Sequence, residues 1–299
     1  MTSFERRLNT QTIQRTLSNG HATLRGLLGR WMPAGDGTAG GAFVVRRLRT
    51  AIRGDYLNFY LAGQSIAKVE VPVRSGPIRI KVHEKYLDDK ALGDRYLEPP
   101  HTAERGDIDC WIGNAAPRCG LEKRFVDEVL SQNPDVIDVE MALPGQTALR
   151  MDIVALEKAG DGWQLVFWEA KLATNAEARA RAEPKVLNQR QRYLDWLAVP
   201  GNAETGLDAY RRSCVLLVEL HALAQDVNPG IGALGEGIRA VAGGAGLTLL
   251  NDIRLLVDAR GDTAKFVENG HLQKLEERGL PVHMVKSAED LVLQVPTCA

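Results

Sequence analysis

The sequence predicts an α/β fold, because helical and strand-like segments alternate through most of its 299 residues. The prediction rests on the middle of the chain. A helical pattern over 121–131 ends at Asn133-Pro134, since proline cannot continue a helix and restricts the residue before it. It is followed by three apolar strand-like segments at 136–141, 150–157 and 163–171. A helix at 184–197 and a further strand at 214–220 come after them. The predicted order is therefore helix, three strands, helix, strand.

Zones on either side extend this core. Residues 1–105 are expected to form an α+β domain. It begins with a polar helical stretch, which a glycine-rich loop at 33–41 follows. Three strands come next, at 56–61, 65–71 and 78–83, and a linker at 98–106 ends the zone. Residues 106–220 form the core zone. Residues 221–299 are expected to form an α/β extension. It has a glycine-rich helix at 229–243, a strand at 253–258 and a second helix at 264–278. Two short strands are expected around Val282 and Leu291.

Composition indicates a soluble globular protein, with 44% hydrophobic and 25% charged residues. The four cysteines have no metal-binding spacing and predict free thiols in a reducing cytoplasm. No signal-like segment or membrane-spanning run is present, so we expect a cytoplasmic protein without a membrane partner. The formal net charge of −1 gives no global positive field. A nucleic-acid partner would therefore need local basic patches and metal ions.

Charged residues gather at one end of a predicted hairpin. The segments 150–157 and 163–171 are joined by a short polar loop with two glycines, which predicts antiparallel strands. Side chains alternate along a strand, so Glu169 and Lys171 point the same way. Asp152 lies on the partner strand, close to them. Three charges on the edge of an apolar sheet are costly unless they serve a purpose.

These residues and their neighbours resemble the PD-(D/E)XK nuclease superfamily. The matching positions are Glu122, Asp152, Glu169-Ala170-Lys171 and the Gln189-x-x-x-Tyr193 element, the last being similar to the branch related to the RecB nuclease domain. The resemblance covers residues 121 to 220, and Met151 stands where the eponymous proline would be. It implies a restriction-endonuclease-like αβββαβ core with a mixed central sheet. The implied activity is Mg²⁺- or Mn²⁺-dependent hydrolysis of DNA, in DNA processing or phage defence.

The chemistry of such an enzyme suits these residue types. Oxygen ligands hold Mg²⁺ or Mn²⁺, so Asp152 and Glu169 are expected to bind the metal, with the Ala170 carbonyl as a third ligand. Lys171 would orient water or offset negative charge in the transition state. Glu122 would complete the metal shell, or is an ordinary acid of an amphipathic helix.

The helix after the hairpin is expected to add to the site. Gln189 and Tyr193 share one face of this helix and are expected to reach the active edge, with half-buried packing as the alternative for Tyr193. Basic residues around Gln189 would suit a phosphate backbone or form a solvated face: Arg179, Arg181, Lys185, Arg190 and Arg192.

The sequence leaves several alternative functions open. A ribonuclease would use the same residues, and a non-catalytic nucleic-acid- or protein-binding module would keep the fold. The N-terminal domain would recognise substrate, a protein partner or a second copy of the chain. The basic run 46–53 would bind nucleic acid or form a surface element. Gly230-x-Gly232-x-x-Gly235 matches a dinucleotide-binding pattern, but a polar connector separates it from the preceding predicted strand.

Overall fold

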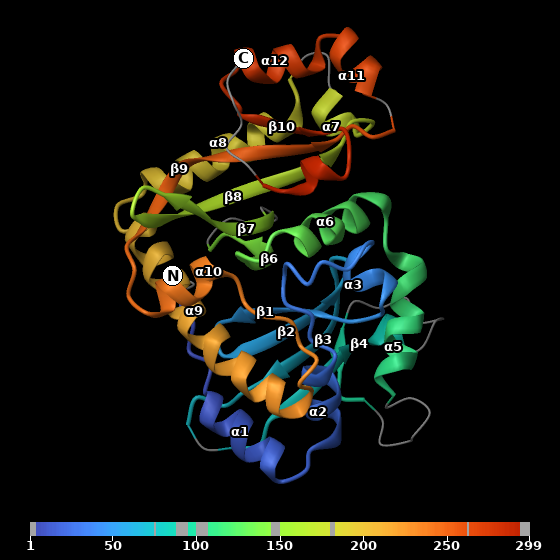
Figure 1. The fold of residues 1–299 in the computed structure, drawn as a ribbon, viewed down its shortest axis with the longest axis vertical. Helices are drawn as coiled ribbons and strands as arrows, with labels where there is room; N and C mark the ends of the chain where they lie inside the picture. The colour runs from blue at the N-terminus through green and yellow to red at the C-terminus, as the bar shows by residue number, and fades with distance from the viewer. Residues whose placement is uncertain are drawn as a thin grey trace.

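The computed structural model describes residues 4–74, 76–87, 95–99, 107–144, 150–179, 183–261 and 263–293. The protein forms two lobes, each built on one sheet (Figure 1). The elements before residue 120 are α1 (Thr10–Ser18), α2 (Ala22–Gly29), α3 (Gly41–Val44), β1 (Arg49–Arg53), β2 (Tyr56–Leu61), β3 (Gln64–Glu70), β4 (Arg79–His83), α4 (Glu84–Leu87), β5 (Tyr96–Leu97), α5 (Ile108–Ala115) and η1 (Ala116–Arg118).

The elements after residue 120 begin with a helix and three strands, as predicted. They are α6 (Leu121–Gln132), β6 (Val136–Ala142), β7 (Arg150–Ala159), β8 (Gly162–Leu172), α7 (Ala176–Arg179), α8 (Lys185–Ala198), α9 (Asn202–Val227), α10 (Glu236–Ala242), β9 (Leu247–Asp258), α11 (Thr263–Glu268), α12 (His271–Glu277), β10 (Val282–Val285) and η2 (Glu289–Leu291). The predicted mixture of helices and strands is thereby confirmed.

The N-terminal sheet has the order β1-β2-β3-β4-β5 within the described residues, and every pair is antiparallel. Alternation gives it two different faces. Leu57, Phe59 and Val69 are fully buried in one hydrophobic core with α1, α2 and α5. Tyr56 and Asn58 point to the opposite face, toward the second lobe. The three predicted strands match β2, β3 and β4, whereas most of the predicted linker lies outside the described residues.

The second sheet is mixed, with the order β10-β9-β8-β7-β6 in the part of the chain that the structure describes. The pairs β6–β7 and β7–β8 are antiparallel, and β9 and β10 continue the sheet in parallel with β8. Apolar residues of α6 pack on one face of this sheet. Residues of α8 and α9 pack on the other face. Figure 1 shows α9 running from this lobe alongside the N-terminal one.

The strand predicted at 214–220 is wrong, because these residues lie inside the 26-residue helix α9. A short apolar run does not distinguish a strand from a buried helix segment. Buried positions such as Tyr210, Cys214, Leu217 and Leu220 recur every three or four residues, which is the helical spacing. The strand that pairs with β8 is instead β9, so the second sheet continues beyond the predicted boundary at residue 220.

Three further predictions near the C-terminus need correction. The glycine-rich helix begins only at Glu236, after an irregular segment. The helix predicted over 264–278 is two helices, α11 and α12, because Gly270 has a φ of +72° and interrupts the helical backbone. The strand expected around Leu291 is a turn of 3-10 helix.

Buried ion pairs join the two lobes. Arg49 of β1 donates to Asp127 of α6 over 3.0 Å, and both side chains are almost completely buried. Asp138 of β6 accepts hydrogen bonds from Arg53 and from the Tyr210 hydroxyl. The prediction of a surface element for the basic run 46–53 is therefore wrong at Arg49. These arginines hold the fold together instead of meeting solvent.

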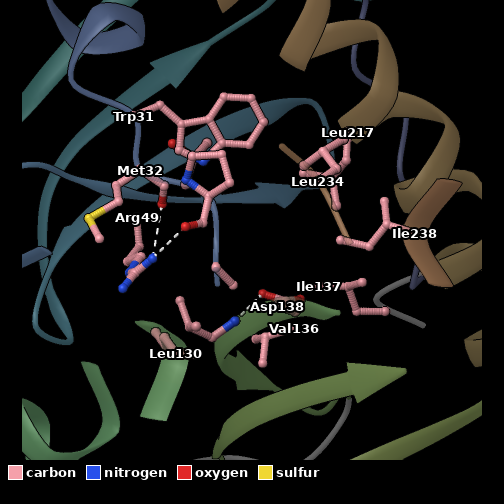
Figure 2. A pocket seen from close by; sticks show the side chains of 14 residues that line it. Trp31, Met32, Arg49, Leu130, Val136, Ile137, Asp138, Leu217, Leu234 and Ile238 are labelled. Carbon is pink, nitrogen blue, oxygen red and sulfur yellow. Dashed lines mark hydrogen bonds between the residues drawn. The ribbon is translucent and has the colours of Figure 1, made fainter. Parts of the chain in front are cut away.

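A small cavity lies at this junction (Figure 2). Arg49 donates there to the Met32 and Pro33 carbonyls, and Leu217 and Ile238 line the opposite side. The volume is about 30 Å³, roughly the share of one water molecule in the liquid. The cavity is thus too small to be a ligand site.

Replacing Asp127 by alanine is expected to destabilise the protein by about 3–5 kcal/mol, because it leaves the buried Arg49 charge without its partner. Asp109→Ala is the matched control, since it removes the partner of Arg30 in an exposed pair and should cost no more than about 1 kcal/mol. Urea unfolding measures both. Equal losses in the two variants would contradict the account of the lobe junction.

Among the described helices, none is both long and apolar enough to cross a membrane. Cys110, Cys119 and Cys214 are free thiols, as predicted. Burial raises the pKa of Cys119 to about 11 and that of Cys214 to about 12. Both buried thiols are therefore protonated packing residues at neutral pH.

Candidate active site

The hairpin β7–β8 positions the candidate site. Ile153 pairs with Trp168, so their neighbours Asp152 and Glu169 lie opposite each other. Gly160 has a φ of +56° in the two-residue turn that joins the strands. One oxygen of Asp152 accepts a hydrogen bond of 2.9 Å from the Ala170 amide. The two carboxylates therefore lie side by side on the face of the sheet that α8 covers.

Glu169 is the most constrained residue of the cluster. The residue is only 2% exposed. Its Oε1 atom accepts from Lys171 Nζ over 2.6 Å and from Gln189 Nε2 over 2.8 Å. Its Oε2 atom is buried, and no described residue gives it a hydrogen bond. A buried carboxylate oxygen without a partner is costly, unless a cation or a water completes it.

Lys171 connects this pair of carboxylates to α6. Its ammonium group also donates to the Ala170 carbonyl over 3.2 Å and lies 3.6 Å from Glu122 Oε1. The other oxygen of Glu122 accepts from Asn175 over 2.7 Å, which fixes the orientation of this acid. The structure thus brings Glu122, Asp152, Glu169, Lys171 and Gln189 together from three separate segments of the chain.

Burial and mutual repulsion raise the pKa values of the two acids, Asp152 and Glu169. Burial, assisted by the nearby Asp152 charge, raises the pKa of Glu169 to about 8. Burial likewise raises the pKa of Asp152, although Lys171 and Lys123 act against this shift. Burial alone would lower the pKa of Lys171, but Glu169, Asp152 and Glu122 outweigh it and raise that pKa. The cluster therefore holds a permanent cation beside carboxylates that bind a proton or another cation readily.

Two residues at the site were missed by sequence reasoning. Lys123 Nζ lies 4.0 Å from Asp152 Oδ1 and forms an ion pair with Glu140. Glu140 lies in β6 between two residues that pair with β7 on either side of Asp152, and its φ of +52° is rare for a residue other than glycine. Such strain commonly marks functional sites. Neither residue belongs to a recognisable motif, although Lys123 directly follows Glu122.

Tyr193 lies outside the cluster. It is fully buried, and its hydroxyl donates to the Leu250 carbonyl over 3.2 Å. Its ring packs against Phe167 and Trp196. Among the basic residues around Gln189, Arg190 forms an ion pair with Asp252, and Arg181 lies outside the described residues. The face of α8 therefore contributes one side chain, Gln189, to the cluster.

The glycines of the 230–235 segment have a structural role. The segment follows helix α9 instead of a strand, so the arrangement of a dinucleotide-binding turn is missing there. A Cβ atom at Gly235 would lie 2.1 Å from Asp135 Oδ1. The same carboxylate accepts from the Ile238 amide at the start of α10. Close packing against Asp135 explains why glycine is required at this position.

The donor set suits a hard divalent cation. Asp152 and Glu169 offer buried carboxylate oxygens, and the Ala170 carbonyl faces the same ammonium group as Glu169. Magnesium is often held by only one or two carboxylates together with water and substrate phosphate. No group of three or more His, Cys, Asp or Glu side chains with the arrangement of a metal site occurs among the described residues. Glu122 contacts the two carboxylates only indirectly, through the Lys171 ammonium group that lies 3.6 Å from its Oε1 atom.

Comparisons with protein-family models, with curated proteins and with solved structures find no match to this chain. The resemblance to the PD-(D/E)XK superfamily therefore stays a prediction from the sequence motifs.

The raised pKa of Glu169 predicts how stability depends on pH. Without metal, the folded protein binds this proton more tightly than the unfolded chain, whose glutamate has an ordinary pKa of 4.5. Stability from this group is therefore fully present below pH 4.5 and is lost as the pH rises to about 8.

We expect metal-free wild type to lose up to about 5 kcal/mol of stability over this range relative to Glu169→Gln. Urea unfolding in a chelator at several pH values measures the difference. Parallel pH profiles for the two proteins would show that Glu169 does not titrate in this way.

Proposed function

We propose that this protein is a metal-dependent nuclease that hydrolyses phosphodiester bonds of DNA, with Mg²⁺ or Mn²⁺ as the cofactor. The observation that carries the proposal is the buried, unpartnered Glu169 Oε2 beside Asp152, with the Lys171 ammonium 2.6 Å from the other oxygen of Glu169. Acids and a lysine in this order on neighbouring strands are the features that resemble the PD-(D/E)XK superfamily.

Each residue has a defined task in this proposal. Asp152, Glu169 and the Ala170 carbonyl hold the metal ion, and Gln189 keeps Glu169 in its orientation through a 2.8 Å hydrogen bond. A bound ion of this kind supplies positive charge that stabilises an in-line displacement at phosphorus. Lys171 orients the attacking water or offsets negative charge on the phosphate. Glu122 holds Lys171 from the side of α6, and Asn175 fixes Glu122 by donating to its other carboxylate oxygen.

A cleavage panel tests the proposal. Single-stranded, double-stranded, linear and circular DNA and an RNA of the same sequence are incubated with the protein in Mg²⁺ or Mn²⁺. We expect metal-dependent cleavage of DNA that is lost in Asp152→Ala and retained in Asp161→Ala, which removes an aspartate from the exposed turn of the same hairpin.

Cleavage of RNA alone would replace the deoxyribonuclease by a ribonuclease. No cleavage of any substrate with either metal would contradict the enzyme and favour a non-catalytic binding module.

A further inference from the structure

A large polar cleft lies between the two lobes. Its volume is about 970 Å³. One wall is the polar face of the N-terminal sheet, formed by β2 to β5. The other wall comes from the second lobe and includes Lys123, Glu140 and Arg150. Both sheets thus contribute to one concave surface.

The sheet wall is held in place by its own hydrogen bonds. Asn58, only 5% exposed, donates to the Tyr60 hydroxyl over 2.6 Å. Asn58 also accepts from Ser65 over 2.6 Å, and Ser65 accepts from the Tyr96 hydroxyl. Three strands are thereby linked side chain to side chain. A polar surface fixed before binding loses little entropy when a ligand arrives.

The lining of the cleft is strongly basic, although the whole chain has a net charge of −1. Its charged residues comprise one acid, Glu140, and six cations, Arg6, Arg53, Lys68, Lys85, Lys123 and Arg150. Arg6 and Arg53 are engaged with Asp138, and Lys123 is engaged with Glu140. Lys85 and Arg150 form no ion pair with any described residue. A local positive field of this kind attracts a polyanion even when the whole protein is nearly neutral.

Aromatic rings accompany these cations. The Lys68 ammonium lies 3.7 Å from the centre of the Tyr96 ring and 5.7 Å from that of Tyr56. The two rings hold the charge over the sheet face, where Tyr56 and Tyr96 are only partly buried. Cations interleaved with aromatic rings on a sheet face are typical of surfaces that bind unpaired nucleic-acid strands.

The cleft leads directly to the candidate active site. Arg150 lines it and lies two residues before Asp152 on β7, on the same side of that strand. Lys123 lines it as well, with its ammonium group 4.0 Å from Asp152 Oδ1. Gly63, in the turn between β2 and β3, approaches Lys123 so closely that a Cβ atom there would lie 2.4 Å from Lys123 Cδ. A chain bound in the cleft would therefore end beside the carboxylates.

We propose that this cleft binds an unpaired nucleic-acid strand and delivers it to the Asp152–Glu169 site, so that the substrate is a single strand or a frayed end. This inference rests on the proposed nuclease function. The observation that favours an unpaired strand is the pair of partly buried rings, Tyr56 and Tyr96, beside the Lys68 ammonium, because bases can stack on aromatic rings only when they are unpaired.

Binding without cleavage tests the inference. Fluorescence anisotropy with labelled strands of about 12 nucleotides, single-stranded or as a blunt duplex, is measured in a chelator. The test variant is Lys85→Glu with Arg150→Glu. The control is Lys158→Glu with Arg25→Glu, which makes the same charge change outside the cleft; Lys158 and Lys85 each lie 5.0 Å from the centre of an aromatic ring.

Wild type is expected to bind the single strand more tightly than the duplex. The test variant should bind the single strand at least about tenfold more weakly and with a smaller salt dependence, and the control should stay within about twofold of wild type. Tighter binding of the duplex, equal losses in both variants, or equally tight binding of polyglutamate would overturn the cleft proposal.

The two proposals fail in different ways. Glu169→Gln should bind the single strand as wild type does. Wild-type binding through the cleft without any metal-dependent cleavage would contradict the nuclease while supporting the cleft. Cleavage that is equal in the test variant and in wild type would contradict the cleft while leaving the nuclease supported.

Discussion

Glu169→Gln is expected to reduce phosphodiester hydrolysis by at least about a thousandfold, because a metal ion supplies several kcal/mol of transition-state stabilisation. Glutamine retains the size of the side chain and an oxygen able to accept from Lys171, but it lacks the negative charge that a divalent cation requires. Since burial already opposes this charge in the metal-free protein, the variant should fold at least as stably as wild type at pH 8.

Single-turnover cleavage in saturating Mn²⁺ measures the loss. Glu236→Gln is the matched control, since Glu236 is an exposed acid in the first turn of α10, away from the cluster. Its activity should equal that of wild type. Comparable activity in Glu169→Gln and wild type would show that this carboxylate does not hold a catalytic metal.

Lys171→Met is expected to lower kcat by about a hundredfold to a thousandfold, the range found when one preorganised transition-state donor is removed. Methionine keeps most of the apolar stem but removes the ammonium group that lies 2.6 Å from Glu169 and 3.6 Å from Glu122. Metal binding should not weaken, because a competing cation has been removed from beside the carboxylates.

A lower kcat with unchanged metal affinity would distinguish a catalytic role of Lys171 from a purely structural one. Cleavage rates are measured over a Mn²⁺ titration for wild type, Lys171→Met and Lys171→Arg. Arginine should restore part of the rate, since it restores the charge with a different shape. A variant that needs far more metal but reaches the wild-type rate would make Lys171 a structural partner of the acids only.

The site was predictable where its geometry is local. Alternation along a strand and a short turn fix the positions of Asp152, Glu169 and Lys171 relative to one another, and the structure places them together. Gln189 follows because α8 packs across the same face. Lys123 and Glu140 could not be predicted, since their approach to Asp152 depends on how α6 and β6 pack and on an unusual backbone angle at Glu140.

The fold was predictable except where local pattern and tertiary packing disagree. The apolar run at 214–220 satisfies both a buried strand and one side of a helix, and the surrounding helical spacing decides for α9. The basic cleft was beyond prediction for another reason. Lys85 and Arg150 are 65 positions apart in the sequence and line one cleft only through the packing of the two lobes.

Isothermal titration calorimetry with Mn²⁺, in the absence of nucleic acid, tests the metal site most directly. We predict saturable binding to wild type that tightens as the pH rises through about 8, because the Glu169 proton must leave first. The same titration of Asp152→Asn and Glu169→Gln should show no saturable binding at this site, whereas Asp161→Asn should bind as wild type does. Unchanged Mn²⁺ binding in Asp152→Asn and Glu169→Gln, or no binding to wild type, would contradict the proposal that these two carboxylates form the metal site of a nuclease.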